Sequence, residues 1–179
     1  MTVQADWRVE IEKMRREKDT FFASDTDSPI TAEEKPHFNG FKYFPPDPKY
    51  LFKVRLHRQK GQNAVVMATS KGTDQRFFNV GYFEFELDGQ KVQLHAYTSA
   101  ERDDKDLFIP FRDATSGKAS YGAARYLDLP LSSTDVYALD FNYAYNPYCA
   151  YNDEYVCPLP PKENWLGVEI RAGKKKYRD

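Results

Sequence analysis

Side chains that hydrogen-bond and stack, together with a few that ionise, gather in the second half of the chain. The candidate ligand-binding residues are Tyr121, Arg125, Tyr126, Asp140, Asn142, Tyr145, Asn146 and Cys149. Aromatic walls with an acidic or amide anchor suit a polar, aromatic or cationic small molecule. The sequence therefore predicts a small-molecule binding site. In the competing interpretation, the Asp and Asn side chains satisfy the backbone of an irregular loop, and the tyrosines cover one end of a barrel.

Two other functions would use the same residues. As an enzyme, the protein would use Asp140 as a general base or Cys149 as a nucleophile, with Arg125 as an anion clamp. No lysine, arginine or histidine lies close to Cys149 in the sequence to lower its pKa. Cys149 and Cys157 therefore stay open as a reduced pair, a disulfide or a reactive thiolate. As an interaction module, the protein would dock a partner protein on this aromatic segment.

Tyrosine and positive charge are unevenly distributed along the chain. Eight of the 13 tyrosines fall within residues 121–155, whereas residues 127–161 contain no lysine or arginine. The whole chain of 179 residues has 26 basic and 27 acidic residues and a net charge of -1. Because no overall positive field exists to hold phosphate backbones, we expect no nucleic-acid partner. The length suits one domain.

Motifs for common cofactors and catalytic machinery are missing from the sequence. The G-x-G-x-x-G, G-x-S-x-G and phosphate-binding loop patterns do not occur. His37, His57 and His95 are scattered through the first half, without a His-Glu-x-x-His or Cys-x-x-Cys pattern. The sequence therefore predicts no metal site and no cofactor.

Apolar runs are short throughout the sequence. No stretch of 18 apolar residues occurs, and the first residues lack the charged-then-apolar order of a signal peptide. We therefore expect a protein without a membrane span, located in the cytoplasm. The sequence leaves the oligomeric state open.

Residues 1–36 are predicted to form a helical segment packed on the domain. Within residues 2–22, apolar side chains recur every three or four positions, which places them on one face of a helix. An amphipathic helix must bury its apolar face, and its own domain offers the nearest surface. The residues of this face are Val3, Trp7, Ile11 and Met14.

Residues 37–173 are predicted to form an antiparallel β domain of about eight short strands, as a barrel or a sandwich. Apolar and polar residues alternate in residues 52–57 and 166–171, which is typical of half-buried strands. Lys60-Gly61 resembles a turn between two strands. Residues 174–179 follow as a basic tail.

Asp88-Gly89 gives the strongest local signal, because this dipeptide suits a two-residue type I′ hairpin. That loop fixes the register of the two strands, with apolar pairs on one face and polar pairs on the other. The predicted pairs are Phe85 with Val92, Phe83 with Leu94, Glu86 with Lys91, and Tyr82 with His95.

A strand from Val136 would place Asp140 on the same face as Ala138 and Asn142. If that face points inward, the Asp140 carboxylate is buried and needs a cation or several hydrogen-bond donors. Arg125 is the nearest basic candidate in this half of the sequence.

Several long strings resemble an uncharacterised prokaryotic family, domain-of-unknown-function family 1684. The matching strings are FNGFKYFP at 38–45, LFIPFRDATSG at 107–117, YG at 121–122, RYLD at 125–128, DFNYAYNPYCAY at 140–151, CPLPP at 157–161 and EN at 163–164. The family usually has glycine and glutamate where this chain has Ala124 and Lys174. The resemblance implies a shared fold and a shared site in the second half, but no established activity.

Overall fold

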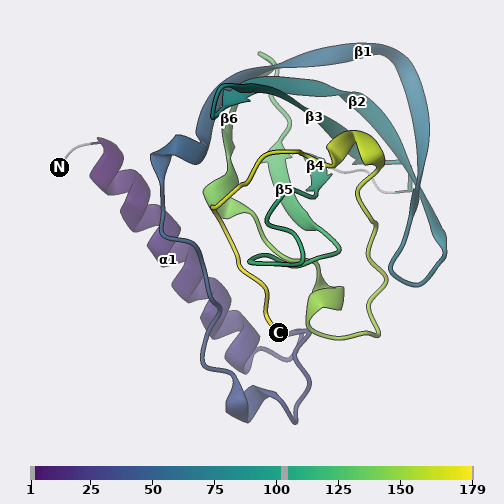
Figure 1. Ribbon diagram of the computed structural model, residues 1–179. Helices are drawn as coiled ribbons and strands as arrows, with labels where there is room; N and C mark the ends of the chain where they lie inside the picture. Colours follow the sequence, from purple (N-terminus) through teal and green to yellow (C-terminus); the bar gives the residue numbers. More distant parts are fainter. Residues whose placement is uncertain (1–2, 102–104, 179) are drawn as a thin grey trace.

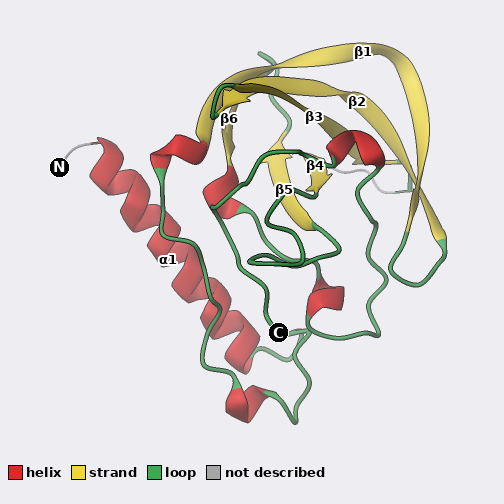
Figure 2. Cartoon of the chain, in the orientation of Figure 1, coloured by secondary structure: helices red, strands yellow, loops and turns green. Residues whose placement is uncertain are grey.

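The computed structural model describes residues 3–101 and 105–178, and within these ranges one long helix lies beside a curled antiparallel sheet (Figures 1 and 2). Positions 1–2 of the predicted helical segment and position 179 of the predicted tail lie outside the described residues. The sheet forms a nearly closed barrel, as predicted for this fold class. None of the described helices is long and apolar enough to cross a membrane.

Six strands make up the sheet in the order β5-β4-β3-β2-β1-β6, and every neighbouring pair is antiparallel. The strands are β1 Leu51–Ala68, β2 Asp74–Leu87, β3 Gln90–Ser99, β4 Asp106–Phe111, β5 Arg125–Pro130 and β6 Val136–Asp140. Five short 3₁₀ helices complete the described elements: η1 Lys35–His37, η2 Pro48–Tyr50, η3 Phe141–Tyr143, η4 Tyr148–Ala150 and η5 Lys162–Asn164.

The β2–β3 hairpin confirms the predicted register. Asp88 and Gly89 both have positive φ, 51° and 74°, as a type I′ turn requires. All four predicted pairs are present: Phe85 with Val92, Phe83 with Leu94, Glu86 with Lys91, and Tyr82 with His95. This part of the fold follows from two turn residues and the alternation beside them.

The first strands are longer than predicted, which is why six strands replace the expected eight or so in the described residues. Lys60-Gly61 lies inside β1 instead of forming a turn between strands. The chain bends there through an irregularity in the β1–β2 register between Arg58 and Asn63. Gly81 faces this bend with φ 148°, and a Cβ atom there would lie 2.3 Å from the His57 carbonyl oxygen. Only glycine fits so close to a neighbouring backbone.

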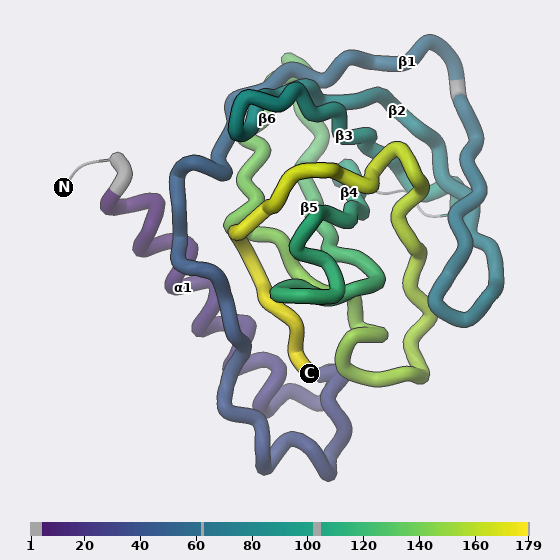
Figure 3. The backbone as a smooth tube through the Cα atoms, viewed as in Figure 1, coloured from purple at the N-terminus to yellow at the C-terminus, as the bar shows by residue number. Residues whose placement is uncertain are grey.

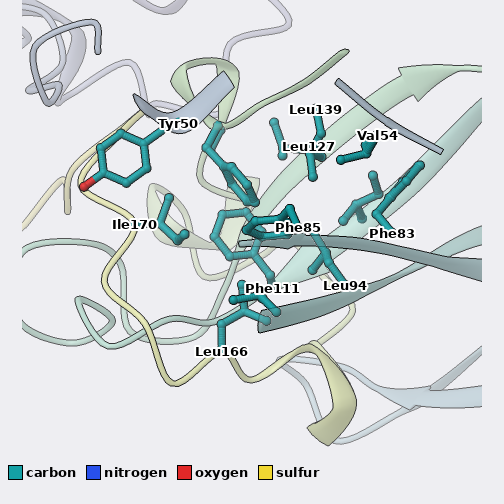
Figure 4. Close-up of a cluster of buried hydrophobic side chains, with 14 of the residues drawn as sticks. Tyr50, Val54, Phe83, Phe85, Leu94, Phe111, Leu127, Leu139, Leu166 and Ile170 are labelled. Carbon is teal, nitrogen blue, oxygen red and sulfur yellow. The ribbon is translucent and has the colours of Figure 1, made fainter. Parts of the chain in front are cut away.

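The barrel interior holds the main apolar core (Figure 4). Alternate residues of β2, β3 and β6 point into it, including Phe83, Leu94 and Leu139, which are fully buried. Residues 166–171 form no strand, although Leu166 and Ile170 are buried in this core as their alternation predicted. Their backbone instead bonds to the segment that follows β4, for example from Leu166 N to Arg112 O at 2.8 Å.

Helix α1, Val3–Ser24, runs along one side of the barrel (Figure 3). Ile11 on its predicted apolar face is fully buried, Trp7 and Met14 are half-buried, and the Val3 side chain is not among those described. Near the end of the helix, Phe22 packs with Ile30 and Tyr151 in a second apolar cluster outside the barrel. The helix therefore docks on its own domain.

Candidate functional site

A cavity of about 720 Å³ lies between α1 and the surface formed by β5 and the loops after β6. This size falls within the range of small-molecule pockets in proteins. The lining residues are Met14, Glu17, Lys18, Phe21, Phe22, Tyr126, Asp128, Tyr145, Asn146, Pro147, Tyr148, Tyr155, Val156, Cys157 and Lys174. Most of these side chains are aromatic or apolar, so the cavity presents apolar walls with a few polar groups.

Three of the eight predicted site residues line this cavity: Tyr126, Tyr145 and Asn146. Tyr126 and Tyr145 face each other across a two-way backbone bridge, with N–O distances of 2.8 and 3.0 Å. The Tyr126 hydroxyl donates to Pro158 O, and the Tyr145 hydroxyl donates to Asp128, each at 2.5 Å. Burial raises the pKa of both phenols, so both remain protonated donors.

Asn146 is buried, and its amide is half satisfied. Its Nδ2 donates to Lys175 O at 2.9 Å, but its Oδ1 has no hydrogen-bond partner among the described residues. A buried acceptor without a partner is costly, and a ligand donor would relieve that cost.

Lys174 brings a buried amine to the cavity. The residue is 2% exposed, and its Nζ lies 3.4 Å from the centre of the Phe41 ring. The rings of Phe22, Tyr151 and Tyr43 follow at 4.9, 5.5 and 5.6 Å. These four rings, of which Phe22 also lines the cavity, form an aromatic cage around the amine, and such cages attract cations.

The backbone before Lys174 needs a glycine to reach this position. Gly173 has φ 73°, and a Cβ atom there would lie 2.6 Å from Ala144 O and 2.7 Å from Phe141 O. Lys174 N then donates to Ala144 O at 2.9 Å. Residues 174–178, predicted as a basic tail, therefore lie against the domain, and Arg178 bonds to Tyr151 O at 2.9 Å.

Lys18 of α1 supplies the second amine of the cavity. Its Nζ lies 4.7 Å from the centre of the Tyr145 ring. Burial lowers the pKa of Lys18, and the negative charge of Asp128 opposes that shift. Residues 127–161 contain no lysine or arginine, and both amines of the cavity come from the two ends of the chain.

Cys149 and Tyr121 lie together beside the cavity without lining it. The Tyr121 hydroxyl is 3.8 Å from Cys149 Sγ, and Cys149 N donates to Cys157 Sγ at 3.4 Å. Both cysteines are buried free thiols. A hydrogen bond from Cys157 lowers the pKa of Cys149 to about 6, and the same bond raises the pKa of Cys157. Cys157 is the member of the pair that reaches the cavity wall.

Arg125 lies in the interior, away from the cavity, and pairs with Asp113 at 3.0 Å. Its guanidinium also donates to the carbonyl oxygens of Ala172 and Ile170 at 2.5 and 2.8 Å. The predicted neighbour Asp140 is not its partner among the described contacts. Arg125 thus joins β5 to the backbone of Ile170 and Ala172 near the C-terminus.

Asp140 and Asn142 hold the N-terminal half of the molecule to β6. Trp7 of α1 donates its indole N–H to Asp140 at 2.7 Å, and Asn142 N and Nδ2 donate to the same carboxylate at 2.9 and 2.7 Å. The side chain of Asn142 exchanges two 2.9 Å bonds with the backbone of Asp47. The face carrying Asp140 points out of the barrel, and α1 covers it. Asp140 lines a different, smaller cavity of about 380 Å³.

Within residues 3–101 and 105–178, we find no group of three or more histidine, cysteine, aspartate or glutamate side chains that could hold a metal ion. The α1 residues and Lys174 are not among the predicted site residues, because that prediction rested on the tyrosine-rich segment alone. The regular apolar face of α1 was the signal that could have led to Phe22, and the Ala-Gly pair before Lys174 marked a turn in the chain.

A helix packed on a nearly closed antiparallel barrel, with an aromatic cavity between them, defines a mainly β protein with a helix-covered pocket. The chain belongs to the family described as "Protein of unknown function (DUF1684)", whose model matches residues 36–175. It is also similar to the solution NMR structure of an uncharacterised protein from Haloarcula marismortui. The identity is 40% over 96% of this chain and 95% of that chain, with a TM-score of 0.73. No curated protein matches the chain.

Proposed function

We propose that this protein binds a small molecule in the cavity between α1 and the barrel. The observation that carries the proposal is a cavity of about 720 Å³ with mostly aromatic and apolar walls, to which Asn146 adds a polar group. Apolar walls with a few convergent polar groups are typical of ligand pockets. Of the predicted site residues, Tyr126, Tyr145 and Asn146 would contact the ligand.

The other predicted residues would act behind this wall or elsewhere. Tyr121 and Cys149 support the segment that carries Cys157, whereas Arg125, Asp140 and Asn142 have their bonds within the protein. Within the binding proposal, these five residues hold the elements that line the cavity.

A cavity-filling substitution tests the proposal. Met14→Trp would place an indole in the cavity, and Val9→Trp makes the same change on an exposed part of α1 that does not line it. We expect a co-purified molecule, detected by native mass spectrometry, in the wild type and in Val9→Trp but not in Met14→Trp. Small molecules from a metabolite library should likewise raise the melting temperature of the first two proteins only.

Equal ligand-induced shifts in all three proteins would contradict the proposal, because ligands would then bind outside this cavity. An absence of any bound or stabilising molecule in the wild type would contradict it as well. Melting curves without ligand check that both variants fold.

A catalytic role at the edge of the same pocket is the second candidate. It is favoured by the contacts of Cys149 with Tyr121 and with Cys157, which lines the cavity, and by the lowered pKa of Cys149. A thiolate next to Cys157 and Tyr121 would act as the nucleophile on a bound substrate. Cys149→Ser should then abolish turnover of any substrate found, while retaining ligand-induced thermal shifts. Turnover that survives in Cys149→Ser would exclude this role.

A further inference from the structure

Lys174 is a buried amine of the cavity, and the carboxylate that acts on it is Asp19 of α1. Among the described residues, its Nζ has aromatic neighbours but no hydrogen-bond acceptor and no carboxylate within ion-pair distance. Lys18 faces Asp128, and Glu17 pairs with Lys13 at 3.8 Å on the exposed side of α1. Buried amines in proteins normally have a hydrogen-bond acceptor, so the Nζ of Lys174 can take one from a ligand.

Every element packed around Lys174 contributes to its electrostatic environment. Helix α1 contributes Lys18, which disfavours the charged amine, and Asp19, which favours it. Tyr43 and Tyr151 contribute phenols whose pKa is raised, so they carry no negative charge at neutral pH. Burial acts more strongly than these charges and lowers the pKa of Lys174 to about 6. The four ring faces oppose this shift, because they favour the ammonium form.

We propose that the ligand of this cavity is a carboxylic acid with an apolar or aromatic body, and that its carboxylate binds Lys174. This inference rests on the proposed function and adds the chemical class of the ligand. The ligand carboxylate supplies a hydrogen-bond acceptor, which Nζ lacks among the described residues, and adds its negative charge to that of Asp19. A single negative charge suffices, because the charge of Asp128 already acts on Lys18.

The remaining walls fit the body of such a ligand. Phe21, Tyr148, Tyr155 and Val156 offer apolar surface next to Lys174 in the same cavity. Tyr148 and Tyr155 pack edge to face at 5.2 Å, which leaves ring surface for a flat or extended apolar group. A ligand that carries its charge at one end therefore meets the amine with that end and the aromatic walls with the rest.

The composition of the walls disfavours other ligand classes. A cationic ligand would face the amines of Lys174 and Lys18. A doubly charged phosphate ester would place its second charge near Asp128, and like charges in a site of low dielectric repel strongly. A monocarboxylate fits the amines of Lys174 and Lys18 and places no second negative charge near Asp128.

A matched series of ligands tests the inference on the unmodified protein. The probes are 1-naphthylacetate, 4-phenylbutyrate and decanoate, each with its neutral amide and its primary amine counterpart, measured by isothermal titration calorimetry. We expect the best carboxylate to bind at least about tenfold more tightly than its amide, because a charge-assisted hydrogen bond forms in a buried site. The alkyl and aryl members distinguish fatty acids from aromatic acids as the source of the carboxylate.

Two substitutions locate the charge that is recognised. Lys174→Met removes the amine and keeps the length of the side chain, whereas Lys175→Met changes the next residue, which does not line the cavity. We expect the preference for carboxylate over amide to fall close to one in Lys174→Met and to remain in Lys175→Met. Lys174→Gln provides a second test if the methionine variant folds poorly, and the ligand series on the wild type needs no variant.

The outcomes separate the two proposals. If amides or amines bind the wild type as tightly as carboxylates, or if Lys174→Met keeps the preference, the carboxylate inference is overturned while binding in the cavity stands. If no probe of any charge binds, and library ligands stabilise the wild type and Met14→Trp equally, the proposed function itself fails.

Discussion

Arg125 and Lys174 are both buried basic residues, 1% and 2% exposed, yet their surroundings differ. The guanidinium of Arg125 meets Asp113 and two carbonyl oxygens. The amine of Lys174 meets four aromatic rings and no acceptor among the described residues. Arg125 has a counter-ion and two carbonyl acceptors within the protein, and only its Nε lacks a partner among the described residues. Under our proposal, a ligand carboxylate supplies the partner of Lys174. The two residues are almost equally buried, so their hydrogen-bond partners distinguish Arg125, with a structural role, from Lys174, the candidate binding group.

Asp113 holds the Arg125 site together through several hydrogen bonds. Its carboxylate accepts from Arg125 at 3.0 Å, from Ile170 N at 2.7 Å, and from both the backbone and the hydroxyl of Thr115 at 3.1 and 2.8 Å. The network ties β5 to the segments on either side of it. We therefore assign Arg125 and Asp113 to the stability of the barrel.

The largest effect should follow from removing Asp113. Asp113→Ala leaves the Arg125 guanidinium buried without its counter-ion, and we expect a loss of roughly 3–5 kcal/mol in unfolding free energy. Urea denaturation followed by circular dichroism measures this loss. The matched control is Glu169→Ala, which removes the partner of Arg171 in an ion pair that is 57% and 45% exposed. That control should cost less than about 1 kcal/mol, and equal costs for the two variants would contradict the comparison.

Lys174→Met should change stability in the opposite direction. Methionine fills the aromatic cage without carrying an unpaired charge, so we expect an increase of roughly 1–3 kcal/mol in unfolding free energy without ligand. The same urea experiment measures it, with Lys175→Met as the control. A destabilised Lys174→Met would mean that the cation–π contacts of Lys174 outweigh its desolvation.

The gain from Lys174→Met should depend on pH. The folded-state pKa of Lys174 is about 6, and its unfolded value is near the ordinary lysine value of 10.5. Below about pH 6 the amine is charged in both states, so its full burial cost is present. Between about pH 6 and pH 10 the unfolded state binds more protons, so wild-type stability rises and the advantage of the methionine variant shrinks. Denaturation curves at pH 6 and pH 9 check this sign, and an advantage that grows with pH would contradict it.

The contrast between the two cations also explains what the sequence could predict. The Asp88-Gly89 hairpin depends on neighbouring residues, so its register was predictable. The partners of Arg125 were not, because Asp113, Ile170 and Ala172 meet it only after the barrel has closed. Lys174 belongs to a run of basic residues that resembles a solvated tail. Its burial depends on α1 and the segment before η2 packing over it, which no local pattern encodes.

The candidate site was therefore predicted in part. The tyrosine-rich segment does supply Tyr126, Tyr145 and Asn146 to one cavity. Residues 127–161 lack lysine and arginine, and the sequence predicted a polar, aromatic or cationic ligand, but α1 and the C-terminal residues bring Lys18 and Lys174 to the same cavity. Tertiary packing between distant segments thus adds basic groups that the local sequence does not contain.

Asp140 provides the test with the smallest expected effect. Its carboxylate is buried, and its hydrogen-bond donors among the described residues are all neutral. Trp7 donates to one oxygen, and the backbone and side chain of Asn142 donate to the other. Trp7→Phe keeps most of the ring packing and removes one donor, so we expect a loss of roughly 1 kcal/mol. Because Trp7 lies outside the cavity of Lys174, ligand-induced thermal shifts should stay unchanged. A loss of those shifts in Trp7→Phe would instead place Asp140 in the binding site. Lys174 would then no longer be the charged residue that distinguishes this site.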